Sequence, residues 1–196
     1  MKIVLPGGSG QVGTLLARAF HEEGHEVVVL GRSPQPAPWR TTAWDARTLG
    51  PWTRELEGAD AVIGLAGRSV NCRYHARNRK LMIDSRVDST RILGRAIAEA
   101  EDAPRVWLQA STATIYDAAN DEATGVLGGD EPNAPDTWRF SIEVAKAWER
   151  ALEDSVTPRT RQVALRSAIV MSPDANGIFA TLLGLVRRGL GGTCGD

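Results

Sequence analysis

A glycine-rich turn near the amino terminus constrains the fold of this chain more than any other feature. The run Gly7-Gly8-Ser9-Gly10-Gln11-Val12-Gly13 directly follows the apolar run Ile3-Val4-Leu5, and apolar residues at helical spacing come after it until Gly24. This order predicts a strand, a tight turn and a helix. Glycines in that context let the backbone approach a pyrophosphate closely, and the start of the helix favours an anion. We therefore predict that residues 7–13 bind a dinucleotide; a turn of purely structural purpose is the alternative.

The end of the second predicted strand, residues 26–30, indicates which dinucleotide is bound. Gly31, Arg32 and Ser33 follow that strand, where an Asp or Glu would bind the ribose hydroxyls of NAD and repel a 2′-phosphate. An arginine can instead pair with that phosphate. We therefore predict NADP(H), with NAD as the alternative, and assign Arg32 as the phosphate clamp and Ser33 as a hydrogen-bond donor. A solvated surface arginine is the other interpretation of Arg32.

Predicted strands and helices alternate along the rest of the chain. Further strands are expected at 41–44, 61–67, 106–110 and 162–169, and helices at 75–101, 140–152 and 178–186. Such alternation predicts an α/β fold, a Rossmann-like doubly wound parallel sheet with helices on both faces and ligands at the carboxyl ends of the strands. Residues 117–137, rich in Gly, Asp, Asn and Pro, are expected to form a long loop at that rim. We expect one NAD(P)-binding domain over residues 1–196.

The overall composition favours a small-molecule partner over a nucleic acid or a membrane. The 196 residues carry a formal net charge of -1, which gives no electrostatic reason to bind either polyanionic surface. No stretch approaches the ~18 apolar residues of a membrane span. Cys72 and Cys194 have no metal-binding or disulfide spacing, so no metal site is predicted. We expect a cytoplasmic protein, in which the long helix from His75 could pair across a homodimer interface.

Several segments together resemble the extended form of the short-chain dehydrogenase/reductase superfamily, and more closely its sugar-nucleotide epimerase-like branch in the NAD-dependent epimerase/dehydratase family. The resemblance covers the whole chain. It implies that Ala66 and Gly67 lie against the cofactor near the nicotinamide ribose and Asp45 near the adenine, and we count Leu65 and Arg166 among the expected cofactor-binding residues. Beyond the glycine turn it rests on residues 60–67, 78–80, 84–87, 90–91, 110–116, 148–149 and 165–167.

The catalytic positions of that family are only partly present. By the resemblance, Ser111 is the serine that hydrogen-bonds a substrate hydroxyl or carbonyl oxygen, and its place just past a buried strand agrees with a site mouth; local capping is the alternative. The family's Tyr-x-x-x-Lys pair is missing, because a register set on Glu149 puts Ser141 and Ala145 at its two positions. Lys146 is one position away, a rotation of about 100° on a helix.

Tyr116 is the candidate substitute acid or base, five residues after Ser111 at the start of the rim loop. A phenol could act there if a nearby cation lowered its pKa from about 10. Arg166 and Lys146 are the candidate cations. Packing or anchoring of the loop is the alternative role of this tyrosine.

The last residues, 189–196, are glycine-rich, whereas the family that the chain resembles continues there into a substrate-binding region. We expect that region to be largely missing and an apolar sheet edge to be left uncovered. The leading hypothesis is an NADP(H)-dependent oxidoreductase or epimerase-like enzyme acting on a hydroxyl or carbonyl carbon, with a nucleotide sugar as one candidate substrate. The alternative is a catalytically silent dinucleotide-binding module, which the missing Tyr-x-x-x-Lys pair favours.

Overall fold

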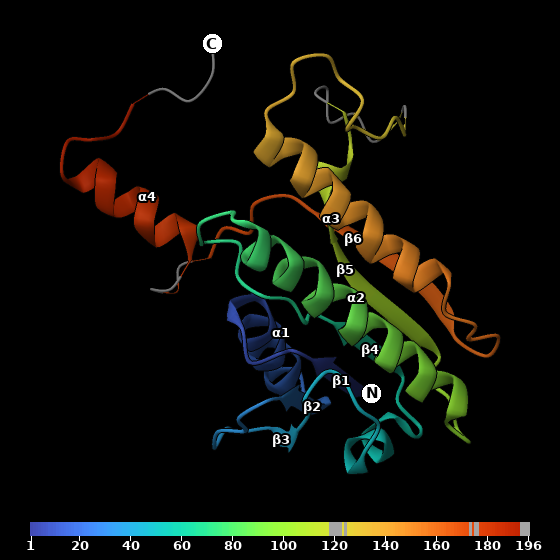
Figure 1. Ribbon diagram of the computed structural model, residues 1–196. Helices are drawn as coiled ribbons and strands as arrows, with labels where there is room; N and C mark the ends of the chain where they lie inside the picture. Colours follow the sequence, from blue (N-terminus) through green and yellow to red (C-terminus); the bar gives the residue numbers. More distant parts are fainter. Residues whose placement is uncertain (118–122, 124, 173, 175–176, 193–196) are drawn as a thin grey trace.

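One parallel sheet of six strands organises the part of the chain that the computed structural model describes, residues 1–117, 123, 125–172, 174 and 177–192. The strand order is β3-β2-β1-β4-β5-β6, and each neighbouring pair is parallel (Figure 1). This is the doubly wound order, so the predicted α/β class is confirmed. The strands are β1 (Lys2–Pro6), β2 (Glu26–Gly31), β3 (Arg40–Ala43), β4 (Ala61–Gly64), β5 (Val106–Thr112) and β6 (Arg161–Ser167).

Helices cover both faces of the sheet, as the alternating pattern predicted. They are α1 (Gln11–Glu22), α2 (Ala76–Glu99), α3 (Asp136–Glu153) and α4 (Ile178–Arg187), with short 3-10 helices η1 (Pro51–Leu56) and η2 (Ala113–Ile115). Strand β1 shows why two layers form, since successive side chains of a strand point to opposite faces. Ile3 and Leu5 pack with Ala17 of α1, whereas Val4 packs in a second cluster with Leu93 of α2. Helices α2 and α3 lie side by side over that second face (Figure 1).

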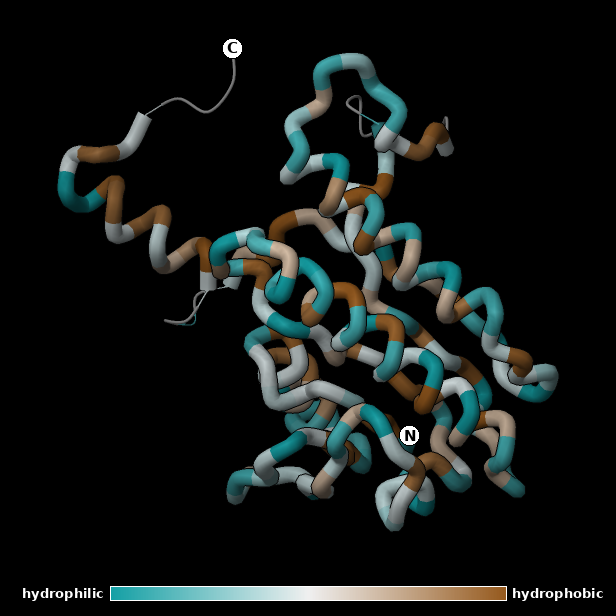
Figure 2. Tube along the Cα trace, in the orientation of Figure 1, coloured by the Kyte–Doolittle hydropathy of each residue, from teal (hydrophilic) through white to brown (hydrophobic). Residues whose placement is uncertain are grey.

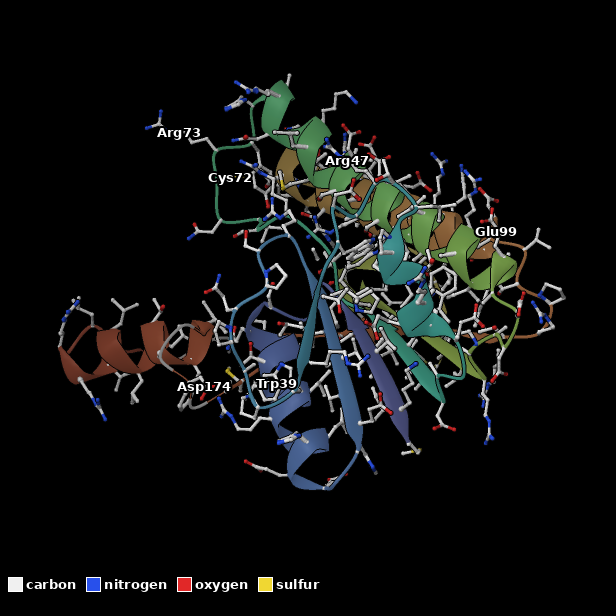
Figure 3. The ribbon with its side chains drawn as sticks, turned by 90° about the horizontal axis from the view of Figure 1, so that it is seen from below. Trp39, Arg47, Cys72, Arg73, Glu99 and Asp174 are labelled. Atoms are coloured by element: carbon white, nitrogen blue, oxygen red, sulfur yellow. The ribbon has the colours of Figure 1, made fainter. Side chains whose placement is uncertain are left out.

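Helix α4 projects away from the sheet (Figure 1), and Figure 2 shows hydrophobic segments along it. None of its residues is buried, and apolar side chains such as Ile178 and Val186 are exposed. An ion pair between Arg18 Nη1 and Asp174 Oδ1 (3.5 Å) links α1 to the segment before α4. Asp174 is labelled in Figure 3. The edge strand β6 exposes Leu165. Apolar surface is therefore present on α4 and along this edge of the sheet.

The observed elements differ from the predicted ones mainly at their ends. Helix α3 begins at Asp136, before the apolar pattern that starts at Phe140, and η1 was not predicted. Strand β4 ends at Gly64, and residues 65–67 form a loop instead of the end of a strand. Part of the predicted rim loop (118–122 and 124) and the last residues (193–196, with Cys194) lie outside the described residues. None of the helices in the described ranges combines the length and apolarity that a bilayer-spanning segment needs.

Candidate cofactor site

The glycine turn joins the carboxyl end of β1 to α1 and contacts two neighbouring strands. Gly7 has a φ of +78°, and its amide donates to the carbonyl of Leu30 at the end of β2 (2.8 Å). A Cβ atom on Gly7 would lie 2.5 Å from the amide nitrogen of Ala66. Leu65 in turn donates to the carbonyl of Pro6 (2.7 Å), which holds the loop after β4 against the turn. Only glycine fits at position 7, because both the backbone conformation and the close approach exclude a side chain.

The start of α1 is packed tightly on one side and open on the other. A Cβ atom on Gly13 would overlap the backbone of Gly8, so these two glycines let the helix lie directly on the turn. At Gly10, the N-cap, the nearest atom to a Cβ would be 3.9 Å away. The first turn of α1 has neither a side-chain cap nor an acidic residue. Its N–H groups and the positive end of the helix dipole therefore suit an anionic ligand.

A cavity of about 680 Å³ lies at the carboxyl ends of β1, β2 and β4. Its volume is in the range of cofactor and small-molecule sites, and its place is the point where the strand order reverses. Eight of the predicted cofactor-binding residues line it: Gly7, Ser9, Gly10, Arg32, Asp45, Leu65, Ala66 and Gly67. Gly31, Trp44, Ala46, Arg47, Arg68, Ser69, Leu81, Ser85 and Asp88 complete the lining.

The other predicted cofactor residues do not line this cavity. Gly8 and Gly13 shape the turn by packing against each other, and Val12 lies within α1. The side-chain amide of Gln11 is buried against Gly177, and its nitrogen has no partner among the described residues. Ser33 is exposed beyond the end of β2. Arg166 belongs to a separate polar cluster at the carboxyl ends of β5 and β6.

Two arginines stand at the β2–β3 side of the cavity. Arg32 is exposed, and no described residue forms an ion pair or hydrogen bond with its side chain. Arg47, which the sequence analysis missed, is also exposed and lines the same cavity, and it is labelled in Figure 3. The position of Arg47 in the sequence gives no signal that it lines the cavity, because the loop after β3 has no fixed spacing from the glycine turn. Both arginines line the cavity, and a guanidinium group is suited to bind a phosphate.

Asp45 shapes the loop that carries Arg47. Its carboxylate accepts hydrogen bonds from the Thr48 hydroxyl (2.6 Å) and from the amides of Thr48 and Arg47 (2.9 Å each). These bonds, led by that of the Thr48 hydroxyl, lower the pKa of Asp45 to about 2. The carboxylate therefore stays ionised and engaged with its own loop. Asp45 lines the predicted adenine end of the cavity, with both oxygens committed to residues 47 and 48.

A second polar cluster lies at the carboxyl ends of β5 and β6. The Ser111 hydroxyl donates to Glu149 Oε1, and Arg166 binds both oxygens of Glu149, through Nε (2.9 Å) and Nη2 (2.8 Å). Arg166 Nη1 also donates to the Tyr116 hydroxyl (2.8 Å), and its guanidinium carbon lies 5.0 Å from the centre of the Tyr116 ring. The bond to Glu149, followed by that to Tyr116, raises the pKa of Arg166. Ser111, Tyr116 and Glu149 are buried.

This cluster brings together Ser111, Tyr116 and Arg166, which were predicted as site residues. It also contains Glu149, which served only to align the sequence with the Tyr-x-x-x-Lys motif. Arg166 is the cation beside Tyr116, whereas Lys146 donates to the carbonyl of Gly128 (2.6 Å). Glu149 is the residue that was missed, and the signal for it was the Trp148-Glu149 pair itself. A carboxylate held by a bidentate arginine can accept a hydrogen bond from a neighbouring hydroxyl. The lone pairs on the oxygen of Ser111 therefore remain available to accept a hydrogen bond from another donor.

The two positions of the missing Tyr-x-x-x-Lys pair hold no acid or base. Ser141 donates its hydroxyl to the carbonyl of Thr137 (2.9 Å), a bond within its own helix. Ala145 is fully buried against Ile115 and Tyr116. Trp148 is in the core, and its indole N–H donates to Thr90 Oγ1 (3.1 Å).

Comparison with known proteins gives matches over the whole chain. The model of the NAD dependent epimerase/dehydratase family matches residues 3–137. The epimerase family protein SDR39U1 of Bos taurus is 35% identical over 202 residues, covering 100% of this chain and 63% of that protein.

Solved structures give matches of the same kind. The crystal structure of human epimerase family protein SDR39U1 (isoform 2) with NADPH superposes with a TM-score of 0.77 at 28% identity, covering 100% of this chain and 63% of that one. The nucleoside-diphosphate sugar epimerase of Corynebacterium glutamicum gives a TM-score of 0.70 at 27% identity, over 99% of this chain and 38% of that one. The chain thus spans less than two thirds of the length of these proteins.

Proposed function

Because the chain belongs to the NAD-dependent epimerase/dehydratase family, we propose that it is an NADP(H)-dependent oxidoreductase or epimerase-like enzyme acting at a hydroxyl or carbonyl carbon. The observation that carries this proposal is the cavity of about 680 Å³, which is lined by the glycine turn, an uncapped helix start and Arg32, an arginine without an ion pair among the described residues. Each of these features suits one part of an NADP molecule. NADPH in the crystal structure of the human relative supports the same cofactor.

In this proposal the cofactor lies across the carboxyl ends of β1, β2 and β4. The pyrophosphate rests on the backbone of Gly10 at the start of α1, where the N–H groups lack a side-chain cap. Arg32 binds the 2′-phosphate, with Arg47 as a second cation of the same cavity lining. Ala66 and Gly67 lie against the nicotinamide ribose. When bound, the nicotinamide supplies or accepts a hydride.

The polar cluster at β5 and β6 is our candidate for proton handling. Glu149 takes the hydrogen bond of the Ser111 hydroxyl, so Ser111 Oγ is oriented to accept a hydrogen bond from a substrate hydroxyl. Arg166 holds Glu149 with two bonds and stabilises a negative charge on the Tyr116 oxygen through a third. Tyr116, or a water molecule, then moves the proton of the reacting oxygen. Tyr116 is only 4% exposed, so its contact with substrate requires a local rearrangement that uncovers its hydroxyl.

A nucleotide sugar is the substrate class that we favour. The nucleoside-diphosphate sugar epimerase of Corynebacterium glutamicum, at 27% identity, is the relative whose name supports it. The reaction would interconvert a sugar hydroxyl and a carbonyl, the chemistry that a hydride-transfer cofactor and a hydroxyl-binding serine serve together.

The cofactor assignment is tested by fluorescence titration of NADPH and NADH on the wild type and Arg32→Glu. We expect the variant to bind NADPH at least about tenfold more weakly, because a charge-assisted bond to phosphate becomes a repulsion, while NADH affinity changes little. Arg91→Glu is the matched control, since Arg91 is exposed on α2 and does not line the cavity. An unchanged preference for NADPH in Arg32→Glu would show that the assignment is wrong.

A catalytically silent dinucleotide-binding module is the second candidate. The observation that favours it is the pair Ser141 and Ala145 at the positions of the family's tyrosine and lysine, together with the burial of Tyr116. A turnover assay on a panel of carbonyl compounds with NADPH separates the two candidates. The enzyme proposal expects Ser111→Ala and Tyr116→Phe to lower the rate. Equal rates in all three proteins would remove both residues from the mechanism, and no turnover by the wild type would favour the silent module.

A further inference from the structure

A second pocket, of about 380 Å³, is formed by the loop before α2 and the first two turns of α3. Its lining consists of Tyr74, Thr137, Trp138 and Ser141, none of which lines the cofactor cavity. The volume is within the range of ~300–1,000 Å³ that is usual for ligand sites. Two of the four residues are aromatic and the other two carry hydroxyl groups. This combination suits a ligand that has a flat ring with polar atoms at its edge.

The Tyr74 side of this pocket is fixed to α3 by several contacts. The Tyr74 ring meets the buried ring of Phe140 edge to face, with 5.6 Å between the ring centres. The guanidinium carbon of Arg79 lies 4.8 Å from the centre of the Phe140 ring, and Arg79 Nε donates to the carbonyl of Tyr74 (2.8 Å). Arg79 also forms an ion pair with Asp136, the first residue of α3. Because these contacts hold the loop on the helix, the pocket is formed without a ligand.

The polar groups of the pocket residues are available to a ligand. Among the residues that the structure describes, none forms a hydrogen bond with the Tyr74 hydroxyl or with the Trp138 indole N–H. Neither atom is among the buried polar atoms that lack a partner, so both are accessible to solvent. Ser141 donates its hydroxyl to the carbonyl of Thr137 and keeps its lone pairs to accept a further hydrogen bond. The pocket residues therefore offer both donors and acceptors to the edge of a ring.

The position of the pocket on α3 relates it to the polar cluster. Helix α3 connects the parallel neighbours β5 and β6, so it starts at the carboxyl end of the sheet, where ligands bind. Ser141 shares one face of α3 with Ala145, which packs against Tyr116. Glu149, one turn further, binds the hydroxyl of Ser111. Eight residues of helix separate Ser141 from Glu149 by about 12 Å along the axis, a distance that one elongated ligand can span.

We propose that this pocket binds a flat aromatic ring of the substrate, which in a nucleotide sugar is the nucleobase, while the sugar lies at Ser111. The proposal rests on the proposed function for the position of the sugar, and it deepens that function by assigning residues to the other end of the substrate. The rings of Trp138 and Tyr74 supply stacking surfaces, which any base can use because every base has a π-face. The diphosphate between base and sugar supplies the length that separates the pocket from Ser111.

The proposal is tested by calorimetric titration of the full chain saturated with NADPH, which keeps other nucleotides out of the cofactor cavity. The probes are the diphosphates of uridine, thymidine, cytidine and guanosine, with inorganic pyrophosphate as the probe that lacks a base. Trp138→Ala removes one stacking surface, Trp138→Phe keeps a ring there, and Tyr74→Leu removes the other ring. Trp39→Ala is the matched control, because Trp39 is also half-buried but lines neither of the two pockets. Circular dichroism checks that each variant folds, and Tyr74→Leu decides if Trp138→Ala does not.

We expect at least one nucleoside diphosphate to bind the wild type about tenfold or more tightly than pyrophosphate does. Trp138→Ala should bind that nucleotide about tenfold or more weakly, because stacking of a base on one aromatic ring corresponds to about 5- to 150-fold in affinity. Tyr74→Leu should weaken binding in the same direction, whereas Trp138→Phe and Trp39→Ala should stay within about threefold of the wild type.

Three results would overturn the proposal: no binding of any nucleoside diphosphate, equal binding of these nucleotides and pyrophosphate, or wild-type affinity in both Trp138→Ala and Tyr74→Leu. A wild type that does not bind NADPH would instead contradict the proposed function. The comparison of Trp138→Ala with the wild type, made on the free protein, would then still decide whether the pocket binds the base.

Discussion

Replacing Arg166 by methionine should destabilise the protein by removing the partner of a buried carboxylate. The Glu149 side chain is 8% exposed and that of Arg166 28%, so water reaches the guanidinium but not the carboxylate. Loss of one partner of a buried ion pair costs about 3–5 kcal/mol. The Ser111 hydroxyl still bonds to Glu149 after the change, and the partial exposure of Arg166 weakens the pair, so we place the loss near the lower end, at about 3 kcal/mol.

The loss is measured by thermal and urea unfolding followed by circular dichroism. For a chain of this length, each kcal/mol shifts the melting temperature by about 2–4 °C, so we expect a decrease of about 6–12 °C. Arg161→Met is the matched control, because Arg161 lies on the same strand with an exposed side chain. The double variant Arg166→Met/Glu149→Gln should be less destabilised than the sum of the single variants, since it leaves no unpaired charge.

Two results would refute this reasoning. One is a destabilisation by Arg166→Met no greater than that by Arg161→Met. The other is strict additivity of the Arg166 and Glu149 substitutions, because groups that share two hydrogen bonds should be coupled by about 0.5–3 kcal/mol. Either result would mean that the cluster in solution is looser than the described geometry.

Three further predictions concern the turn, the Asp45 loop and the core. Gly13→Ala should lower the urea midpoint by an amount equal to about 1–3 kcal/mol, because its methyl group would overlap Gly8, while Gly10→Ala should change it little; similar effects at both positions would contradict the packing of α1 on the turn. The hydrogen bonds that lower the pKa of Asp45 stabilise the fold fully at pH values above the pKa of this group in the unfolded chain, about 4. This contribution is lost as the pH falls toward the folded pKa of about 2. The difference in unfolding free energy between wild type and Asp45→Asn should therefore shrink as the pH falls over that interval, and a constant difference would exclude this role. Trp148→Phe leaves a buried hydroxyl without its donor and should cost about 1–3 kcal/mol by urea unfolding, whereas an unchanged midpoint would show that the indole bond contributes nothing.

The order of elements was predictable from the sequence because each signal for it is local. Apolar periodicity separated strands from helices, and the glycines marked where β1 turns into α1. Helix η1 was not predictable in the same way. Its six residues are too few to show a helical period, and Trp52 and Leu56 are held in place by packing into the core cluster that contains Leu93 of α2. Such a contact between distant parts of the chain leaves no trace in the local pattern.

The composition of the candidate site was predictable only in part, and the reason lies in the register of the sheet. Ser111 and Arg166 are direct partners in the parallel pairing of β5 with β6, so they come together only once both the strand order and the register are known. Glu149 comes from α3, and its orientation follows from helix geometry: positions 141, 145 and 149 are four residues apart and share one face. The missing tyrosine and lysine belong at the first two of these positions, and Glu149 occupies the third. On that face of α3 the ionisable side chain is Glu149, one turn after Ala145, and it binds Ser111 and Arg166. If the chain is an enzyme, a carboxylate and a guanidinium therefore position the groups proposed to handle the proton, Ser111 and Tyr116, and Glu149→Gln should lower the rate as much as Ser111→Ala does.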